Sequence, residues 1–239
     1  MKRICLIMML LALLLAGCAD QEPATVATIS PGPAAVTVNS VDGLLDAVGH
    51  STEINLEAGF YDLSTASDYG AETDNPYYYW ADIGDGYQLT IQNVDTLTIR
   101  GDGKETTKLV HTPRYANVVV LQNCTNVTLE GFTAGHTDGG ECAGGVIHLK
   151  NCEQTELENL GLYGCGTVGI RADSCRDVFV RSCEIYDCSS NGIQADQTDG
   201  LRVENCSIHD LGKDQYAAGS VFWLNQCTNV NILRCEISD

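Results

Sequence analysis

Apolar and polar residues alternate over short stretches of this chain, and the alternation returns at regular intervals. Six aligned tripeptides begin at positions 97, 127, 155, 178, 201 and 230, so their spacings are 30, 28, 23, 23 and 29 residues. Period-two alternation is typical of a strand with one buried face. A repeat of this length predicts a solenoid of stacked units. The third position is apolar in every copy: Ile99, Leu129, Leu157, Val180, Val203 and Ile232.

Each repeat contains three short strands. In one copy they are 192–195, 201–203 and the stretch holding Cys206 and Ile208, and Asn, Asp, Gly and Ser residues separate the strands. No segment between them is long enough for a crossover helix. Such a unit cannot bury its apolar face alone, so the units are expected to stack as parallel coils.

This pattern resembles the right-handed parallel β-helix of the pectate-lyase-like superfamily, from about residue 36 to residue 239. The resemblance implies an all-β solenoid of about seven three-strand coils. It is specific for the fold but not for the activity, because β-helices carry many functions, uronate lyases among them.

The N-terminus predicts export. Lys2 and Arg3 precede an apolar run, Ile4–Leu15, that is too short to span a bilayer. The sequence Leu-Ala-Gly-Cys ending at Cys18 resembles a bacterial lipobox, which implies cleavage before Cys18 and lipid attachment to its thiol. An ordinary secretory signal is the alternative. The expected organisation is a signal peptide at 1–17, a flexible tether at 18–35 and the β-helix at 36–239, held on the extracytoplasmic side of a membrane.

Charge narrows the range of partners. The chain carries a formal net charge of −19, and removing residues 1–17 takes away Lys2 and Arg3, which gives −21. This acidity argues against nucleic acid and against an anionic membrane as binding surfaces. It permits cations, neutral glycans or basic partners, and it also keeps an exported protein soluble.

Two segments near the N-terminal end are expected to close the stack. Ser40–Val48 is the clearest helical stretch, with Leu44, Leu45 and Val48 on one face. It predicts a cap over the first coil. The aromatic cluster Tyr77–Trp80 allows two interpretations, packing within the cap or a platform for sugar rings.

The twelve cysteines follow the repeat rather than a disulfide pattern. Ten lie between Cys124 and Cys235, mostly in two aligned columns. Neighbouring coils would hold them about 4.8 Å apart with parallel side chains, which suits buried stacked thiols better than disulfides. Cys142 falls in a loop outside the columns.

Chemically reactive side chains gather on the outward face of one strand type. Loops 101–117, 135–145 and 212–219 lengthen the coils just before this strand, and the last two are expected to wall a cleft on it. His136 and Tyr216 lie in these loops and are expected to bind substrate. One outward column contains Val120, His148, Arg171, Gln194 and Trp223, and the next contains Gln122, Lys150, Asp173, Asp196 and Asn225.

These columns suggest the chemistry of a uronate lyase. Arg171 can hold a uronate carboxylate, and Lys150 or His148 can remove the proton beside it. Gln194 and Trp223 are expected to contact sugar. Asp173 and Asp196 can share a Ca²⁺ ion, and without a cation their proximity would raise one pKa. The structural alternative is that Lys150–Asp173 and Arg171–Asp196 are ion pairs between coils.

The function expected from the sequence is a surface lipoprotein that binds an extracellular polysaccharide, with catalysis left open. The paired aspartates and Gly-His-Gly of polygalacturonases are absent, and Gly135–Asp138 is not their equivalent. One alternative is a non-catalytic structural or adhesive β-helix that associates end to end. Another is a metal-delivery protein, against which the lack of exposed His and Met clusters counts. The chain stops at Asp239 in mid-coil, which favours either a truncated product or a covering chain.

Overall fold

The computed structural model describes residues 34–137, 143–164, 167–212 and 219–238, all within one compact unit, Gly32–Asp239. The signal peptide, most of the tether and Cys18 lie outside the described residues, so the anchoring predictions concern a part that the structure does not describe. No helix among the described residues is long and apolar enough to cross a membrane.

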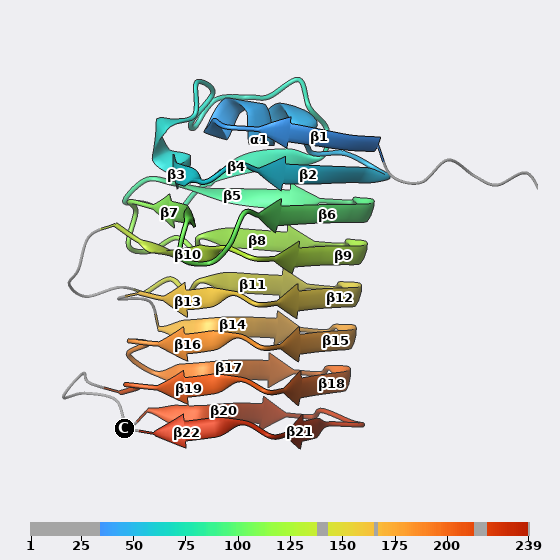
Figure 1. Cartoon of the computed structure of the whole chain (residues 1–239), viewed down its shortest axis with the longest axis vertical. Helices are drawn as coiled ribbons and strands as arrows, with labels where there is room; N and C mark the ends of the chain where they lie inside the picture. Colours follow the sequence, from blue (N-terminus) through green and yellow to red (C-terminus); the bar gives the residue numbers. More distant parts are fainter. Residues whose placement is uncertain (1–33, 138–142, 165–166, 213–218, 239) are drawn as a thin grey trace, which may run out of the picture. The chain divides into compact units, whose positions relative to one another are not determined.

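The unit is a stack of coils built from three sheets (Figure 1). The chain passes from sheet A to sheet B to sheet C and then begins the next coil. Sheet A contains β1 (Ala34–Val38), β2 (Thr52–Leu56), β6 (Asp95–Gly101), β9 (Thr125–Glu130), β12 (Glu153–Glu158), β15 (Arg176–Arg181), β18 (Asp199–Glu204) and β21 (Asn231–Leu233).

Sheets B and C have seven strands each. Sheet B contains β3 (Gly59–Asp62), β7 (Thr107–His111), β10 (Thr133–His136), β13 (Gly161–Tyr163), β16 (Glu184–Tyr186), β19 (Ser207–His209) and β22 (Glu236–Ser238). Sheet C contains β4 (Tyr78–Asp82), β5 (Tyr87–Gln92), β8 (Val119–Gln122), β11 (Ile147–Lys150), β14 (Val168–Asp173), β17 (Asn191–Asp196) and β20 (Ser220–Asn225). Neighbouring strands are parallel except β4 and β5. The predicted parallel β-helix is confirmed.

The core is the apolar column that the repeat predicts. Ile170 and Ile193 pair in register in sheet C, and Val178 and Leu201 pair in sheet A; all four are fully buried. Removing apolar surface of this kind from water contributes roughly 1.5–3 kcal/mol for each side chain. An isolated coil would expose its apolar side chains to water on both sides. This stabilisation therefore depends on the neighbouring coils.

The turns from sheet C to sheet A need a left-handed backbone. Asn93, Asn123 and Asn151 occupy this turn in successive coils with φ of 53°, 53° and 51°. Asn tolerates this conformation better than most residues. The side-chain amides also bond from coil to coil, since Asn123 Nδ2 donates to Asn93 Oδ1 and Asn151 Nδ2 donates to Asn123 Oδ1, both at 3.3 Å. These three amides thus form a hydrogen-bonded ladder along the stack.

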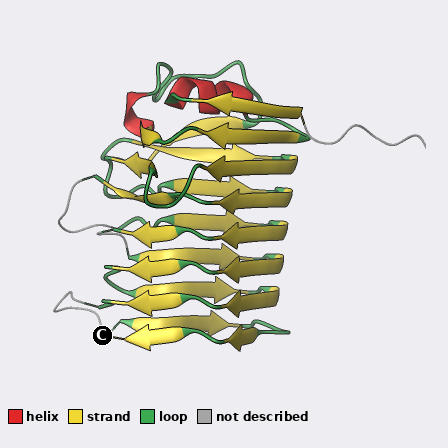
Figure 2. Ribbon diagram, in the orientation of Figure 1, coloured by secondary structure: helices red, strands yellow, loops and turns green. Residues whose placement is uncertain are grey.

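A helical cap closes one end of the stack (Figure 2). The helix α1 (Val41–Ala47) begins at Ser40, whose side chain accepts a hydrogen bond from the Gly43 amide. Leu44, Leu45 and Val48 are buried, as predicted. The short 3-10 helix η1 (Leu63–Thr65) follows β3 in the sequence.

The aromatic cluster belongs to this cap. Tyr78 and Trp80 are 4% and 8% exposed, and both donate to the carboxylate of Asp68. Burial, together with this hydrogen bond, raises the pKa of Tyr78 to about 12. The buried rings cannot present their faces to a sugar, so the packing interpretation is the correct one for these two residues.

The eight described cysteines are free thiols, six of them buried. Their sulfur atoms contact backbone carbonyls, as Cys152 Sγ does at 3.3 Å from Leu121 O. They fill the core as small apolar side chains, in agreement with the prediction. Cys142 lies outside the described residues.

Candidate functional site

The outward columns of sheet C form as predicted. His148, Arg171, Gln194 and Trp223 pair in register across β11, β14, β17 and β20. Lys150, Asp173, Asp196 and Asn225 form the second column on the same strands. Register in a solenoid is set by the apolar columns, because a slip of one residue would turn every core side chain outward.

Asp173 is the centre of the polar cluster on this face. One of its oxygens, Oδ2, lies 2.9 Å from His148 Nε2 and 2.9 Å from Arg171 Nε. Its other oxygen, Oδ1, is buried and has no hydrogen-bond partner among the described residues. Burial pushes the pKa of Asp173 upward, but Arg171 and His148 together bring it below its ordinary value. This carboxylate is therefore charged at neutral pH, and its pKa does not rise as the proximity of Asp196 suggested.

His148 is held neutral. The side chain is 6% exposed, and burial lowers its pKa although the Asp173 carboxylate acts in the opposite direction. The contact with Asp173 makes Nε2 the proton-bearing nitrogen and leaves Nδ1 as the acceptor. A neutral imidazole oriented by a carboxylate is suited to general base chemistry.

The two cations differ in their surroundings. The Arg171 side chain is 44% exposed, and its ion pair is with Asp173 of its own strand rather than with Asp196 of the next coil. Lys150 is half-buried and lies within 4.0 Å of no carboxylate in the described part of the chain. Neither of the two predicted ion pairs between coils, Lys150–Asp173 and Arg171–Asp196, is formed.

Of the remaining predicted site residues, some lie on the outward face of sheet C and others do not. Gln194 is half-buried, and Trp223 is 43% exposed on the outward face. Asp196 Oδ1 accepts a hydrogen bond of 2.6 Å from Asn225. His136 does not lie in a loop: it ends β10, is 4% exposed and bonds to Ala116 O, so it cannot close over sheet C as the sequence suggested. Tyr216 lies outside the described residues.

The two aspartates alone do not complete a calcium site. One oxygen of Asp173 and one of Asp196 have protein partners, and no group of three or more His, Cys, Asp or Glu side chains able to hold a metal occurs in the described part of the chain. Calcium takes six to eight oxygen ligands, so an ion shared by these two carboxylates would need further oxygen ligands.

The long connections lie between sheets B and C, but the expected loop 101–117 is wrong in part, because residues 107–111 form β7 of sheet B. They are 112–118, 137–146 and 210–219, whereas 164–167 and 187–190 are short. The short ones precede β14 and β17, which carry Arg171, Asp173 and Gln194.

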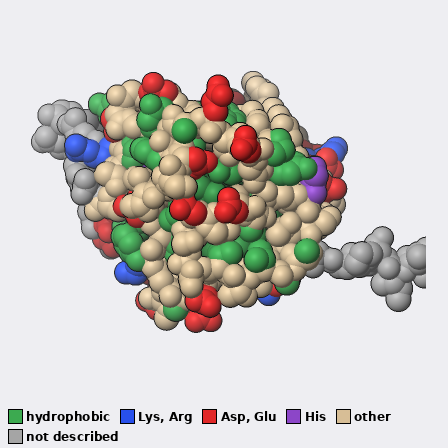
Figure 3. Space-filling model, turned by 90° about the horizontal axis from the view of Figure 1, so that it is seen from above, with side chains coloured by type: hydrophobic (Ala, Val, Ile, Leu, Met, Phe, Trp, Pro, Cys, Tyr) green, Lys and Arg blue, Asp and Glu red, His purple; other side chains and the backbone are tan. Residues whose placement is uncertain are grey.

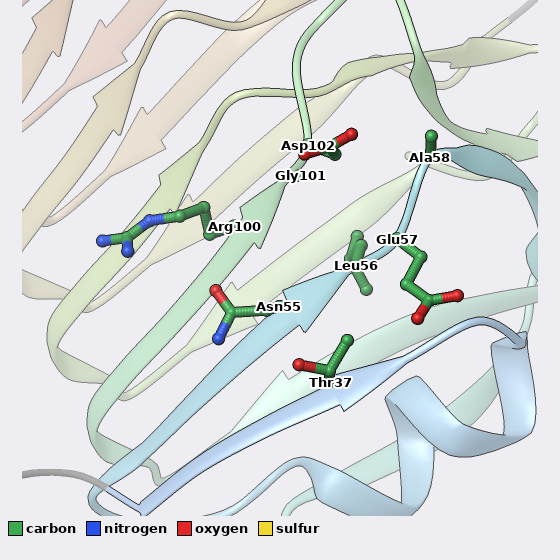
Figure 4. Close-up of a pocket in the computed structure, with 8 residues that line it drawn as sticks. All are labelled: Thr37, Asn55, Leu56, Glu57, Ala58, Arg100, Gly101 and Asp102. Carbon is green, nitrogen blue, oxygen red and sulfur yellow. The ribbon is translucent and has the colours of Figure 1, made fainter.

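A groove that the sequence analysis missed lies at the corner between sheets A and B (Figure 4). Two hollows of about 280 and 400 Å³ share Arg100, Gly101 and Asp102. Arg100 is paired with Glu53 at 3.1 Å and with Glu130, so its charge is compensated. The glycines were the available signal, since a Cβ at Gly101 would come within 2.4 Å of the backbone oxygen of Gly131.

Another hollow, in the cap, has a strongly acidic lining. It has a volume of about 280 Å³, lies in the cap and is lined by Asp42, Asp46, Asp68, Glu72 and Asp74, among others. Figure 3 shows acidic side chains over this end of the stack. Asp68 and Asp42 are engaged by Tyr78, Trp80 and the Ser67 amide, which gives part of this cluster a structural role.

The fold and the repeat define the class as a right-handed parallel β-helix. Residues 87–239 match the family described as "Right handed beta helix region", and the chain belongs to that family. No curated protein matches the chain.

Two solved structures share the fold at low identity. One is a protein of Parabacteroides merdae ATCC 43184 provisionally named a glycosyl hydrolase, with 14% identity, a TM-score of 0.50 and coverage of 82% of this chain and 84% of that one. The other is an alginate lyase from Paenibacillus sp. str. FPU-7, with 11% identity, a TM-score of 0.50 and coverage of 85% and 75%. At these identities the similarity concerns the fold alone.

Proposed function

We propose that this protein is an exported lipoprotein, anchored through Cys18, whose sheet C binds an extracellular polysaccharide containing uronate units and cleaves it by β-elimination. The observation that carries the proposal is the state of Arg171. Asp173 lies 2.9 Å from its Nε, and this guanidinium has no other ion-pair partner among the described residues. A guanidinium positioned in this way has its end free to hold a carboxylate by two parallel hydrogen bonds.

The overall charge of the chain opposes a polyanionic ligand, so the local arrangement must provide the attraction. Lys150 and Arg171 lie diagonally on the neighbouring strands β11 and β14. Lys150 has no carboxylate within ion-pair distance in the described part, and Arg171 shares Asp173 with a neutral imidazole. Lys150 and Arg171 balance the carboxylates of Asp173 and Asp196 on this face, so the face is less acidic than the chain as a whole.

In the proposed reaction, a base removes the proton from the carbon next to the uronate carboxylate. The electron pair forms a double bond to the neighbouring carbon, the glycosidic C–O bond breaks, and the leaving oxygen takes a proton. Arg171 stabilises the charge that develops on the carboxylate. Lys150 and His148 are the two candidates for the base: Lys150 is the more accessible, and His148 is neutral and oriented by Asp173.

Further contacts follow from the same face. Trp223 exposes its ring for stacking on a sugar, and the Gln194 amide lies between Arg171 and Trp223 in the same column. Because His136 is buried, Tyr216 is the loop residue that we propose to contact the sugar. A calcium ion shared by Asp173 and Asp196 would need oxygen ligands from the polysaccharide itself.

The test measures the ultraviolet absorbance of 4,5-unsaturated uronate products when the purified protein is mixed with a panel of acidic polysaccharides, with and without Ca²⁺. We expect absorbance to rise with the wild type and to fall at least about 100-fold in rate with Arg171→Ala, because the developing charge loses its partner. The matched control is Arg202→Ala, which removes an exposed arginine of sheet A that is paired with Glu204.

Base assignment comes from two further variants. Lys150→Met and His148→Gln each remove one candidate, and the variant that abolishes turnover while binding persists identifies the base. If no acidic polysaccharide gives product and none binds in an Arg171-dependent manner, the proposal is wrong for both steps. Arg171-dependent binding without product would remove the elimination step alone.

A second candidate function is assembly, and a specific observation favours it. Five of the eight large apolar side chains that are exposed in the described residues lie on the last coil: Trp223, Leu224, Ile232, Leu233 and Ile237. Exposed apolar surface next to unpaired strand edges promotes association. A structural or adhesive β-helix would use this end of the stack rather than the polar cluster around Asp173.

A further inference from the structure

Two buried histidines that the proposed reaction does not use lie where sheet B meets the connections to sheet C. His111 ends β7 and His136 ends β10, and the two residues pair in register. Their exposed fractions are 0% and 4%. Both ring nitrogens of His111 and Nδ1 of His136 have no hydrogen-bond partner in the described part of the chain. Buried polar atoms are nearly always paired, so this cluster calls for an explanation.

The surroundings of the two rings hold little charge. The centroids of Tyr69 and Trp80 lie 6.1 and 6.2 Å from that of His111. The Asn117 backbone faces the same ring without a hydrogen bond of acceptable geometry. Asp85 is the carboxylate whose field reaches both histidines. Neutral imidazoles are stable here, whereas an imidazolium would lack a partner.

The 112–118 loop rests on this pair. His136 Nε2 donates to Ala116 O at 2.9 Å. On either side of that contact, Asp85 accepts the amides of Arg114 at 2.8 Å and Tyr115 at 3.2 Å. Gln88 Oε1 accepts the Asn117 amide at 2.8 Å. The loop is thus fixed at four successive points over the two rings.

The loop in turn positions the segment that leads into β11. Arg114 O accepts the amides of Ala143 and Gly144, both at 3.1 Å. A Cβ on Gly144 would lie 1.7 Å from Ala116 O, which shows how closely the two segments pack. Gly144 precedes His148 by four residues, so a displacement of the loop would reach the start of the strand that carries His148.

We propose that the His111–His136 pair is an acid-sensitive latch: the neutral rings hold the 112–118 loop closed, and protonation of either ring releases the loop together with the segment before β11. A first proton places an uncompensated charge in a buried site, and a second is repelled by the first. Opening the loop relieves both costs, because it allows water to reach the rings. This proposal is independent of the polysaccharide and of the elimination reaction.

The direction of the pH effect follows from linkage. Burial, with the neighbouring His136, lowers the pKa of His111 to about 4, and burial also lowers that of His136. The folded pKa values lie below the unfolded one, so the closed state has its full stability above the ordinary histidine pKa. It loses stability as the pH falls through that value toward the folded pKa.

The experiment is hydrogen exchange of the full-length chain, read at the Arg114, Tyr115 and Asn117 amides and expressed as protection factors so that intrinsic rates cancel. We expect the protection factors to fall about 30-fold from about pH 7.5 to about pH 5. This ratio follows from a His111 pKa of about 4 in the closed state and about 6.5 in the open state. The interior of β15 serves as the reference, because it contains no histidine.

Two substitutions remove the titration while keeping the contacts. His111→Phe preserves ring packing, and His136→Gln keeps an N–H donor for Ala116 O. We expect the pH step to disappear in the double variant and to persist in His209→Gln, which removes a half-buried histidine of β19. An identical step in the double variant, or loop protection that stays constant relative to β15 down to about pH 5, would overturn the latch.

A measurement on the wild type keeps the proposal testable if the double variant does not fold. The imidazole ¹⁵N resonances of His111 and His136 report the ring charge directly. We expect both rings to remain neutral where the loop is protected and to become charged where protection is lost. If either ring becomes charged near the ordinary histidine pKa while the loop amides remain protected from exchange, the proposal is wrong.

Discussion

Individual side chains on sheet C share one face but not one environment. Alternation places Val120, His148 and Arg171 in the same outward column, yet they are buried, buried and exposed, respectively. The first two belong to coils with long connections before the strand, and Arg171 belongs to a short one. Exposure therefore varies along one outward column, although the strand pattern is the same in each coil.

Thr155 shows the same contrast inside the core. It lies between Val127 and Val178 in the inward column of sheet A, fully buried, and its Oγ1 has no partner within the described residues. Thr198 is also buried, but its hydroxyl lies 3.2 Å from Ala172 O and bonds to it. The two buried threonines therefore differ in whether the hydroxyl has a hydrogen-bond partner.

We expect Thr155→Val to raise the free energy of unfolding by about 1–2 kcal/mol, because the change removes an unsatisfied hydroxyl and restores an apolar column. Thr198→Val should lower it by about 1 kcal/mol through loss of a satisfied bond. Chemical denaturation of the three proteins measures both changes. A destabilised Thr155→Val protein would show that water or a rotated hydroxyl satisfies this group.

At the scale of elements, the turns determine how closely coils stack. The asparagine ladder combines a left-handed backbone with a side-chain bond to each neighbouring coil, so one residue type meets two requirements at Asn93, Asn123 and Asn151. Later coils place Ser174, Gln197 and Gln226 at the same position with φ of 54°, 49° and 52°. The turn therefore needs a left-handed backbone in these coils too, although the residue there is no longer asparagine.

We expect Asn123→Ala to destabilise the protein by about 2 kcal/mol, because alanine disfavours a φ of 53° and two ladder bonds are lost. Asn123→Gly is the matched variant: it keeps the left-handed backbone and removes only the side-chain bonds. Its loss should be smaller. Equal losses in thermal unfolding experiments would assign the whole effect to the ladder and none to the backbone.

At the scale of the whole unit, the two ends of the stack differ. The cap covers the first coils with α1, whose leucines are buried, whereas β20, β21 and β22 leave apolar side chains exposed. Interior residues of the same column are protected: Ile185 and Ile208 are fully buried, and Ile237, the next in register, is 55% exposed.

The exposed apolar side chains of the last coil predict self-association of the 239-residue chain. We expect sedimentation velocity to show oligomers that increase with concentration, and we expect Ile237→Asp to shift the protein toward monomer. Phe60→Asp is the control, because Phe60 is 65% exposed on β3, away from that coil. Persistence of the oligomers in Arg171→Ala would separate assembly from polysaccharide binding. A monomer at every concentration contradicts the prediction.

The sequence by itself determined the solenoid, because a period of two within strands and a repeat of 23–30 residues leave few ways to bury the apolar columns. It therefore also determined the register of His148, Arg171, Asp173 and Asp196, which follows from the core residues beside them. The cap helix and the free, buried cysteines followed from the same pattern.

Only the tertiary structure decided which side chains meet. Asp173 engages His148 across a coil and Arg171 within its own strand, and His136 enters the interior instead of a loop. These outcomes depend on side-chain rotamers and on how the B-to-C connections pack, and neither is encoded in periodicity. The pattern places a residue on a face, whereas burial and charge on that face depend on what covers it.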